Sequence, residues 1–240
     1  MSRPAGPAAL VTVILATRRP AFLPAAVRMI RAQGCAPVEL IVVLHGHPAG
    51  GLPDPQRAAV ADADRAIEAP ASWSIDECLD AGIDAARGEI LAKVDDDDLY
   101  GPGYLGEAVA ALAAGKGDVI GKTEIYVHLV VERQLVLWRP GASGCEQDYV
   151  MGGTLVFTRS LGIPFRVPAG EEPQVPGFLQ RCRAAGHGVY ATSRRHYVHR
   201  RFPQPEHHMW RPNSGLFRRE GIIVRQDVGD DADGLLRLVG

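Results

Sequence analysis

Four consecutive aspartates at positions 95–98 are the residues of this sequence whose type and spacing most clearly indicate chemistry. They follow the mostly apolar run Ile90–Val94, which predicts a buried strand ending in a carboxylate cluster. Adjacent carboxylates raise one another's pKa unless a cation neutralises them. Mg²⁺ and Mn²⁺ take oxygen ligands and are commonly held by one or two carboxylates together with phosphates of a substrate. We therefore expect a metal site whose partner is a nucleotide or another phosphorylated molecule.

A solvated acidic loop is the alternative interpretation of this run, because runs of charge are usually solvated. Side chains of a strand alternate between its two faces. If the strand continues, Asp95 and Asp97 point one way, and Asp96 and Asp98 point the other. This alternation predicts two distinct roles within the cluster.

The elements that must position the aspartates read as the first half of a doubly wound parallel sheet. Residues 9–16 and 38–44 are continuous apolar runs, as expected of strands covered on both faces. The helical pattern between them begins at position 21, and Gly34 stands where a C-terminal glycine cap is expected. Ser74 and Glu77 have the spacing of a capping box and predict a helix over residues 74–86. The aspartates then lie at the carboxyl end of a central strand, where open α/β sheets bind ligands.

The second half of the chain alternates shorter elements. We expect helices over residues 104–114 and 175–185, strands at 118–121, 152–157, 189–192 and 221–225, and a hairpin of 124–131 with 134–138. Gly152 and Gly153 open one of these strands, which indicates either close approach of the backbone to a ligand or a bulge. The predicted fold class is α/β, with a mixed, mainly parallel central sheet flanked by helices and a small antiparallel part in the C-terminal half.

Composition limits the function classes. A chain of 240 residues suits one sizeable α/β domain or two small ones, and a net charge of −2 gives no electrostatic footprint for nucleic acid. The four cysteines include no C-x-x-C pair, which is typical of reduced thiols in a cytoplasmic protein. The apolar run near the N-terminus is too short to span a membrane and reads as the first core strand. Attachment to a membrane surface through a partner or a lipid substrate stays open, as does the oligomeric state.

The order of these motifs resembles the family 2 glycosyltransferases of the GT-A fold. The resemblance rests on K-x-D-D-D-D-x-Y-G-P at positions 93–102, followed by Gly-Gly-Thr at 152–154, Gly-Glu-Glu at 170–172 and His-x-Trp at 208–210. It extends over residues 9–210. The set is specific, whereas any one motif alone is weak.

The resemblance implies a donor that is a UDP- or GDP-sugar, bound through Mn²⁺ or Mg²⁺ and transferred with inversion. Asp97 is then the direct metal ligand, Asp95 contacts the metal or the ribose of the donor, and Asp98 has the structural role of fixing the start of the next segment by hydrogen bonding. The donor-binding residues that it implies are Thr17, Arg18, Arg19, His45, Lys93, Asp95 and Asp96. Lys93 is at least as well suited to compensating the aspartates, and Asp96 is expected to point away from the metal.

On the acceptor side, the resemblance implies Glu172 as the general base that takes the proton from the attacking hydroxyl. Glu replaces the family's usual Asp and prolines lengthen the turn, so Glu171 is the alternative base, and a simple N-terminal charge on the following helix is the structural alternative. His208 is the implied third metal ligand, with His207 and His199 as competitors. Arg200 and Arg201 suit diphosphate binding, or form a solvated basic face.

These inferences predict one domain over residues 1–240, with a nucleotide-sugar-binding half at 9–121, an acceptor-binding half at 122–210 and a tail at 211–240. The expected acceptor is a small molecule, an oligosaccharide or a lipid-linked molecule. A metal-dependent nucleotidyltransferase and an inactive nucleotide-sugar-binding protein are the alternatives. A nucleotidyltransferase is disfavoured because the first strand is not followed by a Gly-rich, Lys-containing phosphate loop.

Overall fold

The computed structural model describes residues 9–34, 37–167, 174–203 and 214–240. An eight-stranded sheet lies at its centre, in the order β3-β2-β1-β4-β10-β6-β11-β9. Strand β1 pairs in parallel with both β2 and β4, whereas β10 is antiparallel to β4 and to β6. The strands are β1 (Val11–Thr17), β2 (Val38–His45), β3 (Arg65–Ala69), β4 (Ile90–Val94), β6 (Val119–Gly121), β9 (Cys145–Glu146), β10 (Leu155–Thr158) and β11 (Val189–Ala191). The prediction of a mixed, mainly parallel central sheet is confirmed.

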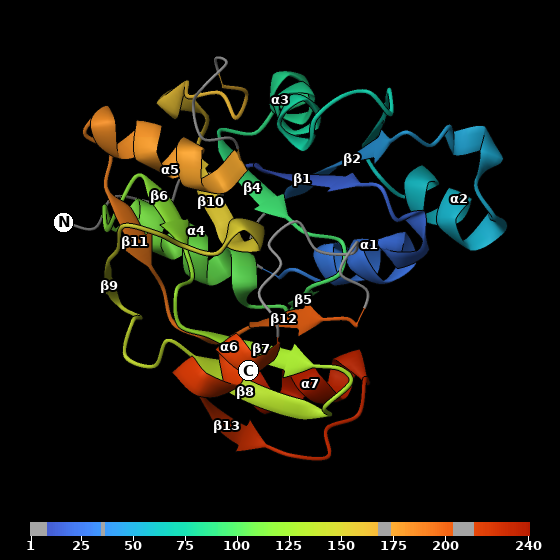
Figure 1. Cartoon of the computed structure of the whole chain (residues 1–240). Coiled ribbons are helices and arrows are strands. Elements are labelled where there is room, and N and C mark those ends of the chain that lie inside the picture. Colours follow the sequence, from blue (N-terminus) through green and yellow to red (C-terminus); the bar gives the residue numbers. More distant parts are fainter. Residues whose placement is uncertain (1–8, 35–36, 168–173, 204–213) are drawn as a thin grey trace.

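Helices cover both faces of this sheet (Figure 1). On one face lie α1 (Leu23–Arg31), α2 (Asp54–Ala61) and α4 (Tyr104–Ala113), and on the other lie α3 (Ile75–Ala85) and α5 (Gln174–Ala184). The predicted capping box begins α3: the Ser74 hydroxyl accepts from the Glu77 N–H at 3.2 Å, and the Glu77 carboxylate accepts from the Ser74 N–H at 2.7 Å. These helices bury the apolar faces of the central strands and fix where the strands end.

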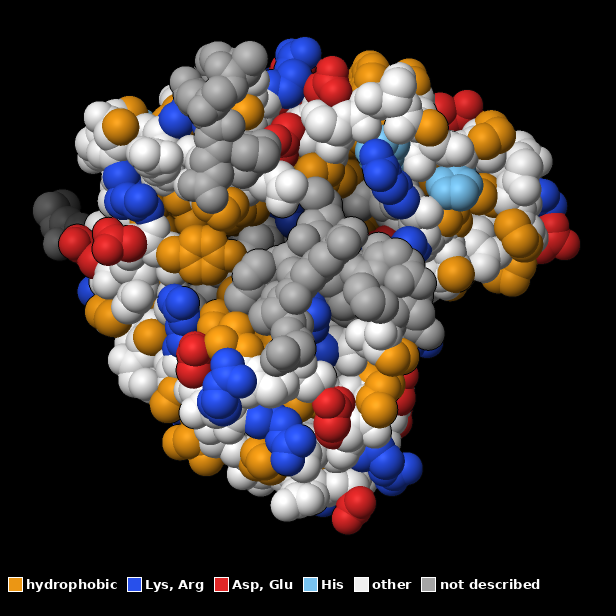
Figure 2. Space-filling model, viewed as in Figure 1, with side chains coloured by type: hydrophobic (Ala, Val, Ile, Leu, Met, Phe, Trp, Pro, Cys, Tyr) orange, Lys and Arg blue, Asp and Glu red, His pale blue; other side chains and the backbone are white. Residues whose placement is uncertain are grey.

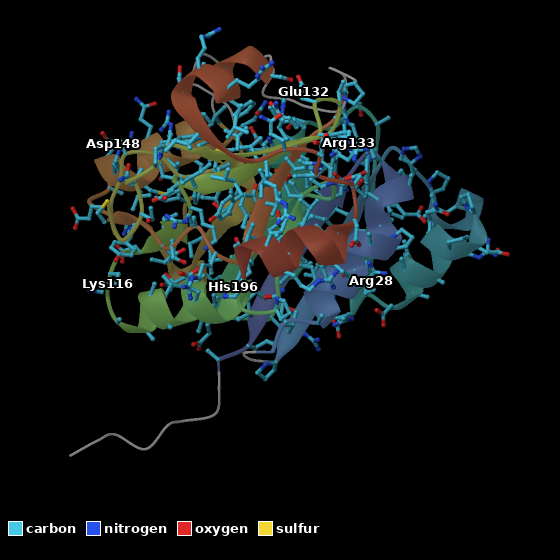
Figure 3. The ribbon with its side chains drawn as sticks, turned by 90° about the horizontal axis from the view of Figure 1, so that it is seen from below. Arg28, Lys116, Glu132, Arg133, Asp148 and His196 are labelled. Carbon is cyan, nitrogen blue, oxygen red and sulfur yellow. The ribbon has the colours of Figure 1, made fainter. Side chains whose placement is uncertain are left out.

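A second, smaller sheet packs below the first in Figure 1, in the order β13-β8-β7-β12-β5. Its strands are β5 (Leu99–Tyr100), β7 (Ile125–Leu129), β8 (Gln134–Trp138), β12 (Tyr197–Arg201) and β13 (Gly221–Arg225), with α6 (Ser214–Glu220) and α7 (Ala232–Val239) packed against it. The predicted hairpin is confirmed as β7 and β8, which turn at Glu132 and Arg133 (Figure 3). Both sheets contribute to one apolar cluster, which joins Val13 of β1 to Val127 of β7.

Some elements differ from the sequence-based expectation. Neither α2 nor β3 was predicted, because residues 48–60 are rich in Pro, Gly and Ala and β3 is a largely exposed edge strand. The glycine cap at Gly34 is wrong: α1 ends at Arg31, its cap is Ala32, and the Gly34 N–H donates to the Pro102 carbonyl at 3.3 Å. Gly152 and Gly153 lie in a 3-10 turn (Gly152–Thr154) before β10, not in the strand. In the described ranges no helix has the length and apolar character needed to cross a membrane.

Candidate active site at the carboxyl ends of the central strands

The aspartates lie at the edge of the central sheet where its parallel strands end. β1 ends at Thr17, β2 ends at His45 and β4 ends at Val94, directly before Asp95. Because β1 pairs in parallel with both neighbours, the turns after these strands meet at one edge. The predicted location of the aspartates, at the carboxyl ends of the parallel strands, is therefore confirmed.

Arg19 joins two of the four aspartates. Its Nη1 donates to Asp97 Oδ2 at 2.8 Å, and its Nη2 forms an ion pair with Asp96 Oδ1. Thr17 Oγ1 also donates to Asp96 and accepts from the Arg19 N–H at 2.8 Å. The expected alternation of faces is wrong, because β4 ends at Val94 and the chain bends through residues 96–98. Asp96 and Asp97 consequently share one counter-ion, and Asp96 is turned into the site's ionic network.

Burial makes this network depend on cations. Burial, together with the neighbouring Asp98 carboxylate, raises the pKa of Asp97 to about 7 despite the opposing effect of Arg19. Burial also raises the pKa of Asp96. For Arg19, burial disfavours the charged form, but the carboxylates of Asp97 and Asp96 outweigh it and raise its pKa. An additional cation beside Asp97 would stabilise its ionised form.

Asp98 is buried and acts as an anchor for β12. Its carboxylate accepts from Tyr197 Oη, interacts with His199 Nδ1 at 2.9 Å and accepts from the Arg200 N–H at 3.1 Å. Burial alone would raise the pKa of Asp98, but these partners, His199 foremost, lower it. The structural role predicted for Asp98 agrees with these contacts, although the segment it fixes is β12 and not the one that follows it in the chain. His199 faces Asp98 through Nδ1 and is tied into the same anchor.

Asp95 differs from its three neighbours because its side chain is 40% exposed. Lys93 Nζ forms an ion pair with Asp95 Oδ1 at 2.5 Å, which supports the expected compensating role of the lysine. The Asp95 N–H donates to Tyr100 Oη at 2.8 Å, and Tyr100 Oη donates to the Gly153 carbonyl at 2.7 Å. A Cβ on Gly153 would lie 2.9 Å from carboxylate oxygens of both Asp95 and Asp98. The close approach expected of the paired glycines is thus made to the aspartates themselves.

The roles of Tyr100 and Tyr197 were not predicted from the sequence. Tyr100 was quoted only as part of a motif, and no local pattern signals that its hydroxyl connects Asp95 to a residue 53 positions away. Together with Tyr104, the two tyrosines form a buried aromatic cluster, with ring centroids 5.0 to 6.4 Å apart. Burial raises the pKa of each phenol well above its ordinary value, so both hydroxyls stay neutral donors.

Arg18 and His45 form a separate pair beside the aspartates. Arg18 Nε lies 2.9 Å from His45 Nδ1, and Arg18 Nη2 donates to the Trp73 carbonyl at 3.3 Å. His47 interacts with the Arg18 carbonyl at 2.9 Å. Burial first, and then the charge of Arg18, lower the pKa of His45, so the imidazole is neutral at pH 7. In Figure 2, basic and histidine side chains gather on the part of the surface above β2 and α2.

Comparison with known proteins identifies the family of this chain. The model of the family described as glycosyl transferase family 2 matches residues 12–169, which is well over half of the sequence. The chain belongs to glycosyl transferase family 2. No curated protein matches it.

The family 2 domain also resembles solved glycosyltransferase structures. One is a mannosyltransferase, PcManGT from Pyrobaculum calidifontis in complex with GDP-Man and Mn²⁺, at 14% identity and a TM-score of 0.58 over 82% of this chain and 58% of that one. Another is S. aureus TarS 1-349 in complex with UDP-GlcNAc, at 15% identity and a TM-score of 0.60 over 87% of this chain and 63% of that one. At this identity the likeness shows the GT-A fold. The domain spans about three fifths of the length of these two structures.

The described residues of the family 2 domain fit a divalent metal that is completed by phosphate. Asp95 and Asp97 supply the hard oxygen ligands that Mg²⁺ and Mn²⁺ prefer. Two cationic side chains, Arg19 and Lys93, already neutralise this corner, which shows that it accepts positive charge. Within the described ranges no three His, Cys, Asp or Glu side chains converge as a metal-binding group. A donor diphosphate would supply further oxygens.

Four of the predicted residues lie outside the described ranges. They are Glu171, Glu172, His207 and His208, so the proposed general base and third metal ligand stay predictions. Helix α5 begins at Gln174, whose N–H donates to Asp76 Oδ2 at 2.9 Å. The structure thus places the start of this helix but not the acidic pair before it.

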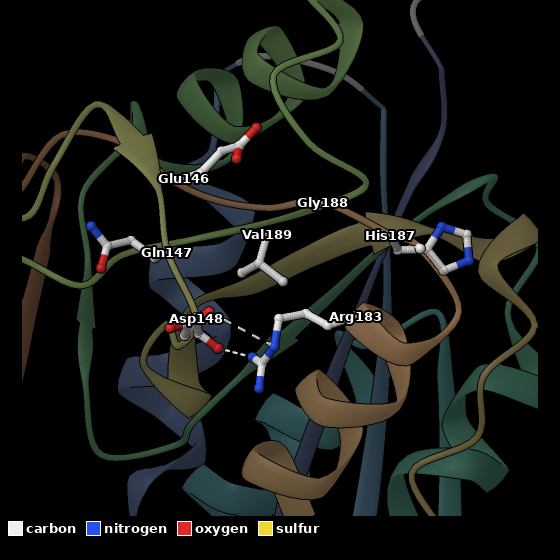
Figure 4. Close-up of a pocket in the computed structure, with 8 residues that line it drawn as sticks. Glu146, Gln147, Asp148, Arg183, His187, Gly188 and Val189 are labelled. Carbon is white, nitrogen blue, oxygen red and sulfur yellow. Dashed lines mark hydrogen bonds and ion pairs between the residues drawn. The ribbon is translucent and has the colours of Figure 1, made fainter.

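A depression of about 450 Å³ lies elsewhere on the family 2 domain (Figure 4). It is open and polar, and it lies where β9 and β11 meet the end of α5. Glu146, Asp148 and His187 line it, and Arg183 pairs with Asp148 across it. It includes no member of the aspartate cluster, so it is separate from the candidate active site.

Proposed function

We propose that this domain transfers a sugar from a nucleoside diphosphate sugar to a hydroxyl group of an acceptor, with inversion at the anomeric carbon. One observation carries the proposal: in a family 2 domain, Asp95 and Asp97 lie at the carboxyl end of β4, with Thr17 and Arg19 beside them at the end of β1. The ligands of the similar structures, GDP-Man with Mn²⁺ in one and UDP-GlcNAc in the other, support a UDP- or GDP-linked donor. We take the donor to bind through the 9–121 half of the chain.

Asp97 and Asp95 would hold Mn²⁺ or Mg²⁺, which offsets the charge that develops on the leaving diphosphate. Lys93 holds the Asp95 side chain in place through its ion pair. The contacts of Asp98 with β12 hold the cluster rigid, because its carboxylate is fully engaged by that strand. The positioning of the two ligands thus depends on residues from both sheets.

The acceptor side of the reaction rests on the acidic pair before α5. Glu172 would take the proton from the acceptor hydroxyl as that oxygen attacks the anomeric carbon from the face opposite the diphosphate. Glu171 is the alternative base. The acceptor would bind through the 122–210 half of the chain and is a small molecule, an oligosaccharide or a lipid-linked molecule.

The proposal is tested by incubating the protein and Mn²⁺ with a panel of UDP- and GDP-sugars. Release of nucleoside diphosphate and the melting temperature with each donor are both measured. Asp97→Asn should lower turnover about a hundredfold or more, because the metal that would offset the charge developing on the diphosphate loses a carboxylate ligand. The matched control is Asp148→Asn in the separate depression of Figure 4, which should turn over like the wild type.

Two outcomes count against the proposal. If no donor is consumed and none raises the melting temperature, nucleotide-sugar chemistry at this site is ruled out. If a donor raises the melting temperature but is never consumed, with or without added acceptors, the domain is a nucleotide-sugar-binding protein without turnover.

A further inference from the structure

The guanidinium of Arg19 occupies the place beside the Asp97 carboxylate that a metal ion would take. The guanidinium forks across Asp96 and Asp97, and its Nη1 lies 2.8 Å from Asp97 Oδ2. The two carboxylates are almost completely buried, at 3% and 7% side-chain exposure. In the donor-free protein Arg19 is therefore a built-in counter-ion for the predicted metal ligand.

A divalent cation and this guanidinium compete for the same carboxylate. Asp97 Oδ2 already accepts a charge-assisted hydrogen bond, and two cations on one carboxylate repel each other. For the metal to bind Asp97 through this oxygen, Arg19 must withdraw. Asp97, in turn, is almost completely buried, so the loss of Arg19 would leave its charge less compensated unless another cation takes that place.

The position of Arg19 in the chain suits such an exchange. Arg19 lies in the turn after β1, outside any strand or helix, and its side chain is 24% exposed. Its guanidinium lies over the ring of Phe22, 5.2 Å from the centroid, and Phe22 contacts Phe202 of the segment after β12. A diphosphate is an equivalent partner for an arginine fork, because phosphate oxygens match its geometry as carboxylate oxygens do.

We propose that Arg19 is an exchange residue: it neutralises Asp96 and Asp97 while the site is empty, and it moves to the donor's diphosphate when the metal takes its place on Asp97. The inference rests on the proposed function, since it needs a metal and a nucleoside diphosphate in this site. The exchange makes metal and nucleotide bind together. Metal alone must displace Arg19 without offering it a new partner, whereas the metal–nucleotide pair provides one. By linkage, each ligand then strengthens the binding of the other by the same factor.

The test is an Mn²⁺ titration followed by electron paramagnetic resonance, with no nucleotide and then with saturating UDP or GDP. Wild type should bind Mn²⁺ weakly alone and more tightly with a nucleotide. Arg19→Ala should raise the affinity for Mn²⁺ alone by about tenfold or more, the size of a charged hydrogen bond. It should also shrink the factor by which the nucleotide strengthens Mn²⁺ binding, because no arginine has to be displaced.

Two further variants distinguish the direct contact of Arg19 with the carboxylates from the general effect of removing a positive charge. Arg18→Ala removes the adjacent cation, which contacts His45 and not the aspartates, and should raise Mn²⁺ affinity less than Arg19→Ala does. Arg28→Ala, on the exposed side of α1 (Figure 3), should leave Mn²⁺ affinity unchanged. If Arg19→Ala does not fold, Arg19→Lys replaces it: one ammonium group cannot bridge both carboxylates, so the shift should have the same direction and be smaller.

The outcomes distinguish this inference from the function on which it rests. If the nucleotide strengthens Mn²⁺ binding in wild type, but Arg19→Ala (or Arg19→Lys in its place) binds Mn²⁺ alone no better than wild type, the exchange is refuted and the donor site stands. An equal rise in Arg18→Ala also refutes it. If wild type binds Mn²⁺ with neither nucleotide, the metal-dependent function fails and the exchange fails with it.

Discussion

At the scale of single residues, four identical side chains acquire different chemistry from their surroundings. Asp95 is partly exposed and paired with Lys93, whereas Asp98 is buried and fully engaged by β12. Asp96 and Asp97 are buried and share Arg19. The carboxylate most accessible to an external ligand is thus that of Asp95. In the proposed exchange, the Asp97 carboxylate becomes accessible only when Arg19 moves away from it. The division of labour inferred from the family resemblance agrees with this geometry for Asp98 and stays a prediction for the metal ligands.

The general base is the residue whose test is most direct. Glu172→Gln keeps the size of the side chain but removes its ability to accept a proton, so transfer to the acceptor should fall about 10²- to 10⁴-fold. UDP or GDP binding with Mn²⁺ should not change, because the base acts on the acceptor. The measurements are the turnover number for transfer and the nucleotide affinity by calorimetry.

Glu171→Gln is the matched control for this prediction. If Glu172 is the base, Glu171→Gln should retain most of the activity. A large loss in Glu171→Gln with little change in Glu172→Gln would move the base by one position. Unchanged transfer in both variants would contradict the assignment of a base to this pair.

At the scale of elements, the site is held by contacts between segments far apart in the sequence. Tyr100 of β5 connects the end of β4 to the 3-10 turn before β10, and Asp98 connects the same region to β12. Strand β12 in turn pairs with β5 and β7 in the smaller sheet. The smaller sheet therefore helps to fix the carboxylates that end a strand of the larger one.

Tyr100→Phe tests this connection. The substitution removes one hydroxyl and leaves the Asp95 N–H and the Gly153 carbonyl without that partner. We expect a loss of about 1–3 kcal/mol in the free energy of unfolding, measured by urea denaturation, since buried polar groups become unsatisfied. Mn²⁺ affinity with UDP should fall as well. Tyr190→Phe on β11 is the control, and an equal loss in both variants would show that Tyr100 has no special role.

The sequence could predict features that depend on residues close together in the chain, but not contacts between distant residues. Apolar runs and the Ser74–Glu77 capping box act over a few residues, and the elements that they indicated are confirmed: β1, β2, β4 and α3. The ionic partners of the aspartates lie up to 101 positions away, and no local pattern connects Asp98 to His199 or Asp96 to Arg19. The alternation rule failed at these residues because it assumed that β4 continues beyond Val94. Local sequence patterns thus predicted where the aspartates lie in the fold. The hydrogen bonds and ion pairs that they form depend on tertiary packing.

At the scale of the whole molecule, histidines with shifted pKa values make the stability of the fold depend on pH. Burial is the main cause that lowers the pKa of His45, His128 and His196, whereas Asp98 raises the pKa of His199 against the effect of burial. A group with a lowered pKa contributes stability above its ordinary pKa of about 6.5 and loses that contribution as the pH falls. His199 behaves in the opposite way, because its contribution is present below that pH and is lost as the pH rises. Protonation of His45, His128 and His196 should therefore destabilise the chain in acid, whereas Asp97, whose pKa is raised to about 7, contributes in the opposite direction.

His128 offers the clearest test because it lies in β7, away from the aspartates, and has no exposed side-chain surface. Its Nδ1 is 3.6 Å from Asp230 Oδ1, an attraction that is too weak to offset burial and the charge of Arg200, so its pKa is lowered. As the pH falls from 7.5 to 5, protonation of His128 should therefore lower the melting temperature of wild type. His128→Leu should lose less over the same interval, because it has no imidazole to protonate; each unit of lowered pKa corresponds to about 1.4 kcal/mol at low pH. Parallel curves for wild type and His128→Leu would show that protonation of His128 does not drive the acid response.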